Sequence, residues 1–292
     1  MGLGLIGGSI ARGLQSQTPS PTVVAVESKD EIGVRALDVG LVEAVFPSVG
    51  DLPEVDLTFL CVPWSALPEV VRDLPPSATS GLLTDVAGVK APVADLLRRA
   101  HPGARFIGSH PMAGGTGGFG ASRRDLFRGC PVALCPGPYG EDTSGRSRDI
   151  DLLSGIWRSL GANPVLLGAE DHDRAVAYVS HLPFLAAIAQ LDLASEDPAR
   201  GDLAGRGLVA ATHHASFPPT SLAEAALENR HLPAAVRKLA ARLVELAEAC
   251  EERPQDLLEL AERARRQRDE LRRQQGQGDG PTGPGARSDT PR

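Results

Sequence analysis

The chain opens on a glycine motif that constrains its fold more than any other segment. Residues 1–9 read M-G-L-G-L-I-G-G-S, so a G-x-G-x-x-G turn starts at the second residue. In a dinucleotide-binding fold the first glycine makes the tight turn, the second lets the backbone approach a pyrophosphate, and the third lets helix and strand pack closely. The following helix presents free N–H groups to the phosphates. We therefore expect Gly2, Gly4 and Gly7 to bind a dinucleotide.

The position of this motif is unusual, because the fingerprint normally follows a strand and here only Met1 precedes it. A strand of about six residues is typical at that place, in the centre of the sheet. We expect that the natural chain starts upstream of Met1, and that this exact chain folds poorly or uses a substitute strand.

The rest of the first half alternates between strand and helix patterns. Short apolar runs lie at residues 22–26, 56–63, 81–86, 105–108, 131–135 and 164–167, with helical stretches between them, including 6–15 and 151–160. This alternation predicts an α/β fold with a doubly wound parallel sheet. From residue 171 the apolar spacing is helical throughout. We predict a dinucleotide-binding domain over residues 1–168, an all-α domain over 169–272 and a disordered tail over 273–292.

Composition excludes several classes of protein. The 292 residues include 30 basic and 37 acidic side chains, and a net charge of −7 disfavours binding to nucleic acid or a membrane surface. The apolar stretch 174–192 is interrupted by Ser180, His181 and Pro183 and is short for a bilayer span. No signal peptide is visible, and the four cysteines have no metal-binding spacing. We expect a cytoplasmic protein without a bound metal.

Glu27 strengthens the interpretation of the glycine motif as a dinucleotide-binding turn. It lies 20 residues after Gly7, at the end of the next predicted strand. A carboxylate there accepts hydrogen bonds from the ribose hydroxyls of NAD and repels the extra phosphate of NADP. We expect NAD as cofactor, while Lys29 leaves NADP open; the alternative is a glycine-rich turn beside an ordinary surface glutamate.

Histidines form three further clusters. His110, in G-S-H-P-M-A-G, follows a predicted strand, where it can exchange a proton during oxidation of a hydroxyl, although such a histidine can equally be a capping or core residue. His172 and His181 are nine residues apart, off a common helical face, so capping and packing are the better interpretation than metal binding. Adjacent His213 and His214 are uninformative by themselves.

Together these segments resemble the prephenate and arogenate dehydrogenase family of tyrosine biosynthesis. The matching motifs, in the family's order, are G-L-G-L-I-G-G-S at 2–9, D-V-A-G-V-K at 85–90, G-S-H-P-M-A-G at 108–114, L-F-R-G at 126–129, D-H-D at 171–173 and S-H-L-P at 180–183. The resemblance reaches to about residue 271.

The resemblance implies a nucleotide-binding domain followed by a helical domain that pairs two subunits into a homodimer. It implies that His110 is the base that takes the hydroxyl proton while hydride passes to the nicotinamide and carbon dioxide leaves. Further cofactor contacts are implied for Leu5, Ile6, Val62, Pro63 and Asp85, and substrate contacts for Gly88, Ser109, His181 and His213.

Three positions depart from the family's pattern. Gly88 stands where many members have serine, Phe184 where many prephenate-specific members have histidine, and His213 where the family has an arginine for the substrate carboxylate. An imidazole lacks arginine's bidentate fork. Arg206, Arg123 or Arg124 could substitute for it.

These departures leave several functions open. We expect a prephenate dehydrogenase. The alternatives are an arogenate dehydrogenase, a related dehydrogenase of another small acid, and a catalytically decayed NAD-binding homologue.

Overall fold

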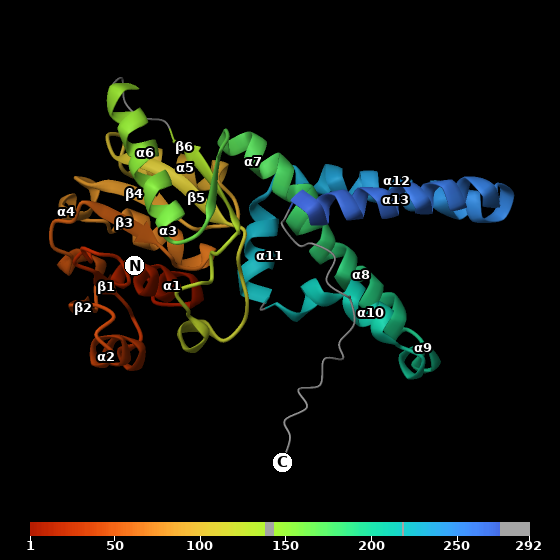
Figure 1. Ribbon diagram of the computed structural model, residues 1–292, viewed down its shortest axis with the longest axis horizontal. Coiled ribbons are helices and arrows are strands. Elements are labelled where there is room, and N and C mark those ends of the chain that lie inside the picture. Colours follow the sequence, from red (N-terminus) through yellow and green to blue (C-terminus); the bar gives the residue numbers. More distant parts are fainter. Residues whose placement is uncertain (138–142, 218, 275–292) are drawn as a thin grey trace, which may run out of the picture. The chain divides into compact units, whose positions relative to one another are not determined.

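The computed structural model describes residues 1–137, 143–217 and 219–274, and the chain divides into two compact units, Met1–Val236 and Arg237–Arg292. The first unit contains all the strands and most of the helices (Figure 1). The candidate site lies entirely within it.

The strands of the first unit form two sheets. A two-stranded sheet pairs β1 (Val24–Val26) with β2 (Ala44–Phe46) in parallel. A five-stranded sheet has the order β3 (Leu57–Leu60), β4 (Leu82–Asp85), β5 (Arg105–Pro111), β6 (Pro131–Pro136) and β7 (Asn163–Leu166). Residues 1–3 lie between the two sheets: the Gly2 amide donates to Val26 O at 2.8 Å, and the Cys61 amide donates to Met1 O at 2.9 Å. These residues place the glycine turn between β1 and β3.

The predicted α/β class is confirmed, with one departure from an all-parallel sheet. β5 and β6 run antiparallel, with Ser109 opposite Leu134. No α-helix crosses over between them, because only a loop and a short 3₁₀ turn, η3 (Gly118–Ala121), connect the two strands. A strand that returns without a crossover helix pairs antiparallel. The strand β2 was not predicted, since its three residues are too few to give a pattern.

Helices cover both faces of the larger sheet. The first half of the chain has α1 (Leu5–Gln15), α2 (Asp30–Asp38), α3 (Leu67–Arg72), α4 (Pro76–Thr79), α5 (Ala91–Ala100) and α6 (Thr143–Ser159), with 3₁₀ turns η1 (Val49–Asp51) and η2 (Trp64–Ala66). Neighbouring residues of β4 enter different cores: Leu82 packs with α1 and α6, and Leu83 packs with α3 and α5. This division is the signature of a doubly wound sheet, because successive strand side chains point to opposite faces.

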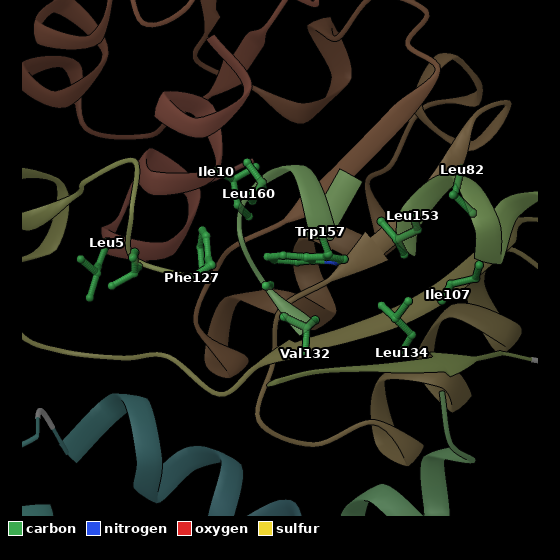
Figure 2. Close-up of a cluster of buried hydrophobic side chains, with 12 residues drawn as sticks. Leu5, Ile10, Leu82, Ile107, Phe127, Val132, Leu134, Leu153, Trp157 and Leu160 are labelled. Carbon is green, nitrogen blue, oxygen red and sulfur yellow. The ribbon is translucent and has the colours of Figure 1, made fainter. Parts of the chain in front are cut away.

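Trp157 of α6 lies at the centre of the first core (Figure 2). It is fully buried, and its ring meets Phe127 edge-on at 5.2 Å and Phe59 at 5.9 Å between centroids. The surrounding side chains are mostly aliphatic: Ile10, Leu82, Ile107, Val132, Leu134, Leu153 and Leu160. Full burial of a large aromatic contributes several kcal/mol, roughly 3–5 when judged by the cost of truncation to alanine.

The second half of the chain is helical, as predicted. α7 (Ala169–Val176), a π-helical turn η4 (Ala177–His181) and α8 (Leu182–Ser195) form one continuous run (Figure 1). The remaining elements are α9 (Pro198–Asp202), α10 (Arg206–Ala211), η5 (His213–Ser216), α11 (Pro219–Glu228), α12 (Leu232–Glu252) and α13 (Pro254–Gln274). The predicted tail begins with two residues of α13, and the rest of it, 275–292, lies outside the described residues.

The run Ala169–Ser195 has 27 residues, and an 18-residue window within it has a mean hydropathy of 1.3, which is the length and composition of a helix that could cross a membrane. A single helix of this kind is weak evidence for a membrane protein. Polar residues inside it, including His172, Asp173 and His181, are buried against the sheet domain and take part in the site described next.

Candidate active site

The glycine turn has the geometry of a phosphate-binding loop. Gly2 has φ +82°, and a Cβ on it would meet Cys61 O at 2.6 Å, while a Cβ on Gly7 would meet Gly2 O at 2.0 Å. No described atom lies within 4 Å of a Cβ built on Gly4, which is the N-cap of α1 and provides no side-chain cap. The first amides of α1, those of Leu5, Ile6 and Gly7, therefore face an open space that fits a pyrophosphate.

Leu5 and Ile6 contribute to this loop by their backbone. Their side chains belong to the first hydrophobic core, Leu5 as a buried member and Ile6 packed against it. Val62 lies beside the loop, since its Cγ1 is 3.3 Å from a Cβ built on Gly2, and Pro63 follows it as the N-cap of η2.

Glu27 stands at the end of β1 with its carboxylate turned toward the same loop. Its Oε2 accepts from the Leu3 amide at 2.7 Å and its Oε1 accepts from the Lys29 amide at 3.0 Å. These bonds fix the carboxylate, and each oxygen keeps a second lone pair for a ribose hydroxyl. The residues around the glycine turn thus fit a dinucleotide.

Asp85, an expected cofactor contact, makes its described contacts away from the glycine turn. The carboxylate is fully buried at the end of β4, where Oδ2 accepts from Lys90 Nζ and from the Ala87 amide. Burial raises the pKa of Asp85, and the neighbouring Lys90 ammonium only partly offsets this effect. Asp85 and Lys90 form a buried ion pair that fixes the loop after β4, and Asp85 Oδ1 has no hydrogen-bond partner among the described residues, so its cofactor contact stays a prediction.

Ser109, an expected substrate contact, makes its described contacts inside the core. Successive strand residues point to opposite faces, so Ser109 and His110 of β5 diverge. Ser109 is fully buried, with its Oγ 2.8 Å from Thr84 Oγ1 and accepting from Trp157 Nε1 at 3.0 Å. Its backbone carbonyl accepts from Lys90 Nζ at 2.7 Å. The hydroxyl predicted to contact substrate therefore connects the sheet to the core instead.

His110 points to the other face, where it meets α7. Its Nδ1 lies 2.8 Å from Nε2 of His172, and Nδ1 of His172 lies 2.7 Å from Oδ1 of Asp173. Asp173 also accepts from the Lys90 amide at 2.7 Å and the Ala91 amide at 2.9 Å, so it caps the start of α5. Three side chains from two elements thus form a hydrogen-bonded chain that ends on a helix N-terminus.

The hydrogen bonds from Asp173 through His172 to His110 determine which ring nitrogen of each histidine carries the hydrogen. The Asp173 carboxylate can only accept, so His172 donates to it from Nδ1–H, and in its neutral form the ring accepts at Nε2. His110 then donates to His172 from Nδ1–H. The lone pair of His110 is consequently on Nε2, the atom that a general base uses here.

The ionisation of these groups agrees with that assignment. Burial acts to raise the pKa of Asp173, but the hydrogen bonds from His172 and from the Ala91 and Lys90 amides outweigh it and lower the pKa. Desolvation lowers the pKa of His110 well below its usual 6.5, and the nearby His172, Lys90 and His181 add to the effect. His110 is therefore unprotonated at neutral pH.

His181 and Gly88 lie beside this base. A Cβ built on Gly88 would be 3.9 Å from Nε2 of His110, 3.9 Å from Nε2 of His181 and 3.0 Å from Cβ of Ala225. His181 is fully buried, and desolvation lowers its pKa to about 4. Its Nδ1 is 3.1 Å from Asn229 Nδ2. Gly88 thus leaves an open position between two neutral imidazoles.

His213 lies apart from these residues on the described contacts. It is an exposed residue of η5 whose ring meets Phe217 at 5.5 Å between centroids. Phe217 Cε1 in turn lies 4.0 Å from a Cβ built on Gly114, so η5 approaches the glycine-rich loop after β5. No described contact joins His213 to His110 or His181.

Sequence reasoning assigned no catalytic role to four residues that organise the site, Lys90, His172, Asp173 and Asn229, and gave His172 only capping or packing. The first three stand in motifs that carry the family resemblance, which is the signal that could have found them. Asn229 had no such signal. Among the described residues, no group of three His, Cys, Asp or Glu side chains could hold a metal ion.

Comparison with known proteins decides the family. Residues 10–166 match the model for the nucleotide-binding domain of prephenate dehydrogenase, and residues 168–265 match the model for its dimerization domain. The chain belongs to the prephenate dehydrogenase family. The same comparison therefore supports the motif-based resemblance.

Individual relatives and solved structures of the family are also similar to this chain. The cyclohexadienyl dehydrogenase of Zymomonas mobilis is 31% identical over 198 residues, which is 67% of this chain and 66% of that protein. The Synechocystis arogenate dehydrogenase structure matches with a TM-score of 0.76 and 26% identity, covering 92% of this chain and 98% of that one. The Aquifex aeolicus prephenate dehydrogenase, solved with hydroxyphenyl propionate and NAD+, matches with a TM-score of 0.82, 24% identity and 92% and 96% coverage. The chain spans 49–66% of the length of the curated relatives it matches.

Proposed function

We propose that this chain is an NAD-dependent dehydrogenase that converts prephenate to 4-hydroxyphenylpyruvate by oxidation and decarboxylation. This proposal rests on the hydrogen bonds that run from Asp173 through His172 to His110. They leave an unprotonated Nε2 of His110 at the end of β5. Oxidation of a ring hydroxyl needs a base at that place. Membership of the family supplies the substrate class.

In this mechanism His110 accepts the hydroxyl proton at Nε2 while the ring carbon loses hydride to the nicotinamide of bound NAD. The C–O bond becomes a carbonyl, which draws the electron pair of the ring carboxylate bond as carbon dioxide leaves. The ring then becomes aromatic, and its oxygen takes back the proton that His110 holds to give the phenolic hydroxyl. Lowering of the His110 pKa keeps the base unprotonated, and the hydrogen bond to His172 holds its ring in place.

We assign the cofactor to the glycine turn, with the amides of Leu5, Ile6 and Gly7 at the pyrophosphate and Val62 and Pro63 beside it. Glu27 would hold the ribose hydroxyls, which favours NAD over NADP because a carboxylate repels a phosphate. Lys29 is adjacent to this carboxylate and supplies a positive charge, so NADP is the second cofactor to measure.

For the substrate we assign Gly88 and His181, which face His110. His213 remains a candidate for the substrate carboxylate on the side of η5 and the Gly114 loop. A separate observation favours arogenate as an alternative substrate. Phe184 is buried in α8 at the position where many prephenate-specific members have a histidine, and family members that prefer arogenate also tend to lack that histidine.

We also propose that residues 1–168 bind the cofactor and that residues 169–272 bind substrate and pair two copies of the chain. Exposed apolar side chains on the run Ala169–Ser195 support subunit pairing, among them Val179 at 64%, Leu193 at 58% and Ile188 at 44% exposure. Burial in a homodimer accounts for its apolar surface without a membrane. A cytoplasmic location suits an enzyme of small soluble acids.

The test is a steady-state assay that crosses prephenate and arogenate with NAD and NADP. We expect reduced cofactor to appear fastest with NAD and one of these two substrates. Turnover of neither substrate by the folded protein would instead favour a dehydrogenase of another small acid or a decayed homologue.

A further inference from the structure

A half-buried imidazole, His110, and a buried one, His181, present their Nε2 atoms to one open position between β5 and the helical run that follows α7. Nε2 of His110 and Nε2 of His181 are each 3.9 Å from a Cβ built on Gly88, and Ala225 closes another side. His181 is fully buried, yet its Nε2 has no hydrogen-bond partner among the described residues. An unpaired buried polar atom is costly, so a ligand atom that pairs with it gains affinity.

Asn229 determines which tautomer His181 adopts. The Asn229 amide nitrogen donates to the Asp173 carbonyl at 2.7 Å, and its amide oxygen accepts from the His231 amide at 3.0 Å. A carbonyl can only accept and an amide N–H can only donate, so both ends of the Asn229 side chain are fixed. Its nitrogen must therefore donate to Nδ1 of His181, 3.1 Å away, and the ring hydrogen of neutral His181 is on Nε2.

The two imidazoles consequently have opposite tautomers. Through His172 and Asp173, His110 has its hydrogen on Nδ1 and a lone pair on Nε2. Through Asn229, His181 has a lone pair on Nδ1 and its hydrogen on Nε2. An acceptor and a donor thus face the same position, which is the complement of a hydroxyl group. An ether lacks the hydrogen for His110, and an ammonium group lacks the lone pair for His181.

We propose that His181 is a second catalytic residue, whose Nε2–H donates to the hydroxyl oxygen that His110 deprotonates, and that Asn229 positions it. This inference rests on the proposed dehydrogenase function. As the hydroxyl is oxidised, its proton moves to Nε2 of His110 and the hydride moves to the nicotinamide. His181 keeps its own proton and holds the oxygen as it becomes a carbonyl. This bond strengthens the pull of the carbonyl on the electrons released by decarboxylation.

Gly88 is part of the same arrangement. A Cβ at this position would enter the space that both Nε2 atoms face. In this chain the donor to the substrate oxygen is therefore the imidazole of His181, and the glycine leaves room for that oxygen.

The test uses a matched pair of variants in the full-length, NAD-loaded protein. Glutamine has an amide nitrogen at the place of Nε2, whereas asparagine reaches only the place of Nδ1, so His181→Gln keeps the donor and His181→Asn removes it. Binding is measured by calorimetry with 3-(4-hydroxyphenyl)propionate and 3-phenylpropionate, which differ only in the hydroxyl.

We expect the wild type to bind the hydroxylated probe about tenfold or more tighter, and His181→Asn to lose that preference, since a hydrogen bond in a buried site typically changes affinity by this factor. The value of kcat/KM should fall about 10- to 100-fold in His181→Asn and recover at least in part in His181→Gln. Equal probe preference and turnover in wild type and His181→Asn would overturn the proposal, as would equal losses in both variants.

The wild-type protein provides a check that does not depend on a variant folding. Nitrogen-15 NMR of the imidazoles should show the hydrogen on Nε2 of His181 and on Nδ1 of His110; the same tautomer in both rings would contradict the assignment. Failure of the proposed reaction is distinguishable, because the probe preference and the tautomers are measured without turnover. Absence of turnover with the probe preference intact would reject the reaction and keep the acceptor–donor pair.

Discussion

His172 is the residue whose replacement tests the catalytic geometry most sharply. Its Nε2 accepts from His110 and its Nδ1 donates to Asp173. His172→Asn places an amide near the former Nδ1, so it keeps a partner for Asp173 and removes the acceptor for His110. His172→Gln places an amide oxygen near the former Nε2, so it keeps that acceptor. The two variants therefore separate support of the base from capping by Asp173.

The expected fall in kcat/KM follows from the loss of the hydrogen bond between His110 and His172. Without His172 Nε2, the Nδ1–H of His110 loses its partner, and its ring is free to adopt the tautomer with hydrogen on Nε2, which cannot accept a proton. An unsatisfied buried donor costs about 1–3 kcal/mol. If this cost appears in the transition state, kcat/KM falls about 5- to 150-fold, at about 1.4 kcal/mol for each factor of ten.

The assay is the initial rate of NADH formation with the preferred substrate, together with thermal unfolding of each variant. We expect His172→Asn to lose activity by the stated factor and His172→Gln to recover most of it, with both variants folded. Full activity in a folded His172→Asn protein would refute the role of this hydrogen bond. Equal losses in both variants would show that His172 acts through packing alone.

Further predictions concern pH and assembly. Because the pKa of His110 is far below 6.5, log kcat/KM should stay level as pH falls through 6.5, and a break near 6.5 in the pH–rate profile would contradict the assignment. The pKa of His181 is about 4 in the folded state, so the unfolded chain binds the extra proton as pH falls from 6.5 toward 4, and folding stability is lost in that window. The full effect is about 3 kcal/mol below pH 4, and chemical denaturation at several pH values should show a smaller loss of stability in His181→Gln than in the wild type, because His110 still contributes to the loss that remains. Leu193→Lys places a charge on the exposed apolar face of α8 and should shift light-scattering mass from dimer to monomer, whereas the control Glu54→Gln on the sheet domain should stay dimeric; a monomeric wild type would reject the dimer.

The sequence predicted the fold class and most of the strands and helices because local patterns determine them. The glycine turn, the apolar runs of β3, β4 and β6 and the helical spacing after residue 171 each predict their element without reference to distant residues. The antiparallel pairing of β5 with β6 was not predictable in this way. It depends on the absence of a crossover helix between the two strands, and the alternating pattern of strands and helices did not show where such a helix is missing.

The site was only partly predictable, because side-chain direction depends on packing. S-H-P-M places Ser109 and His110 together in sequence, but β5 points one into the core and the other toward α7. Asp85 is drawn inward by Lys90, a contact that a pattern of residues does not reveal.

Contacts between residues far apart in the sequence could not be predicted from sequence patterns either. Asp173 caps α5 from 82 and 83 residues away, and Asn229 reaches His181 across 48 residues. These residues acquire their roles only when the helical half of the chain packs against the carboxyl ends of the strands.

The central claim is that His110 is the base of an NAD-dependent oxidation, and the most direct measurement pairs turnover with cofactor binding in His110→Asn. Calorimetry should give the same affinity for NAD in the variant and the wild type, because the glycine turn is untouched. NADH formation from prephenate and arogenate should fall by about 100-fold or more in the variant, as expected for loss of a general base. Turnover at the wild-type rate by a folded, NAD-binding His110→Asn protein would contradict the account.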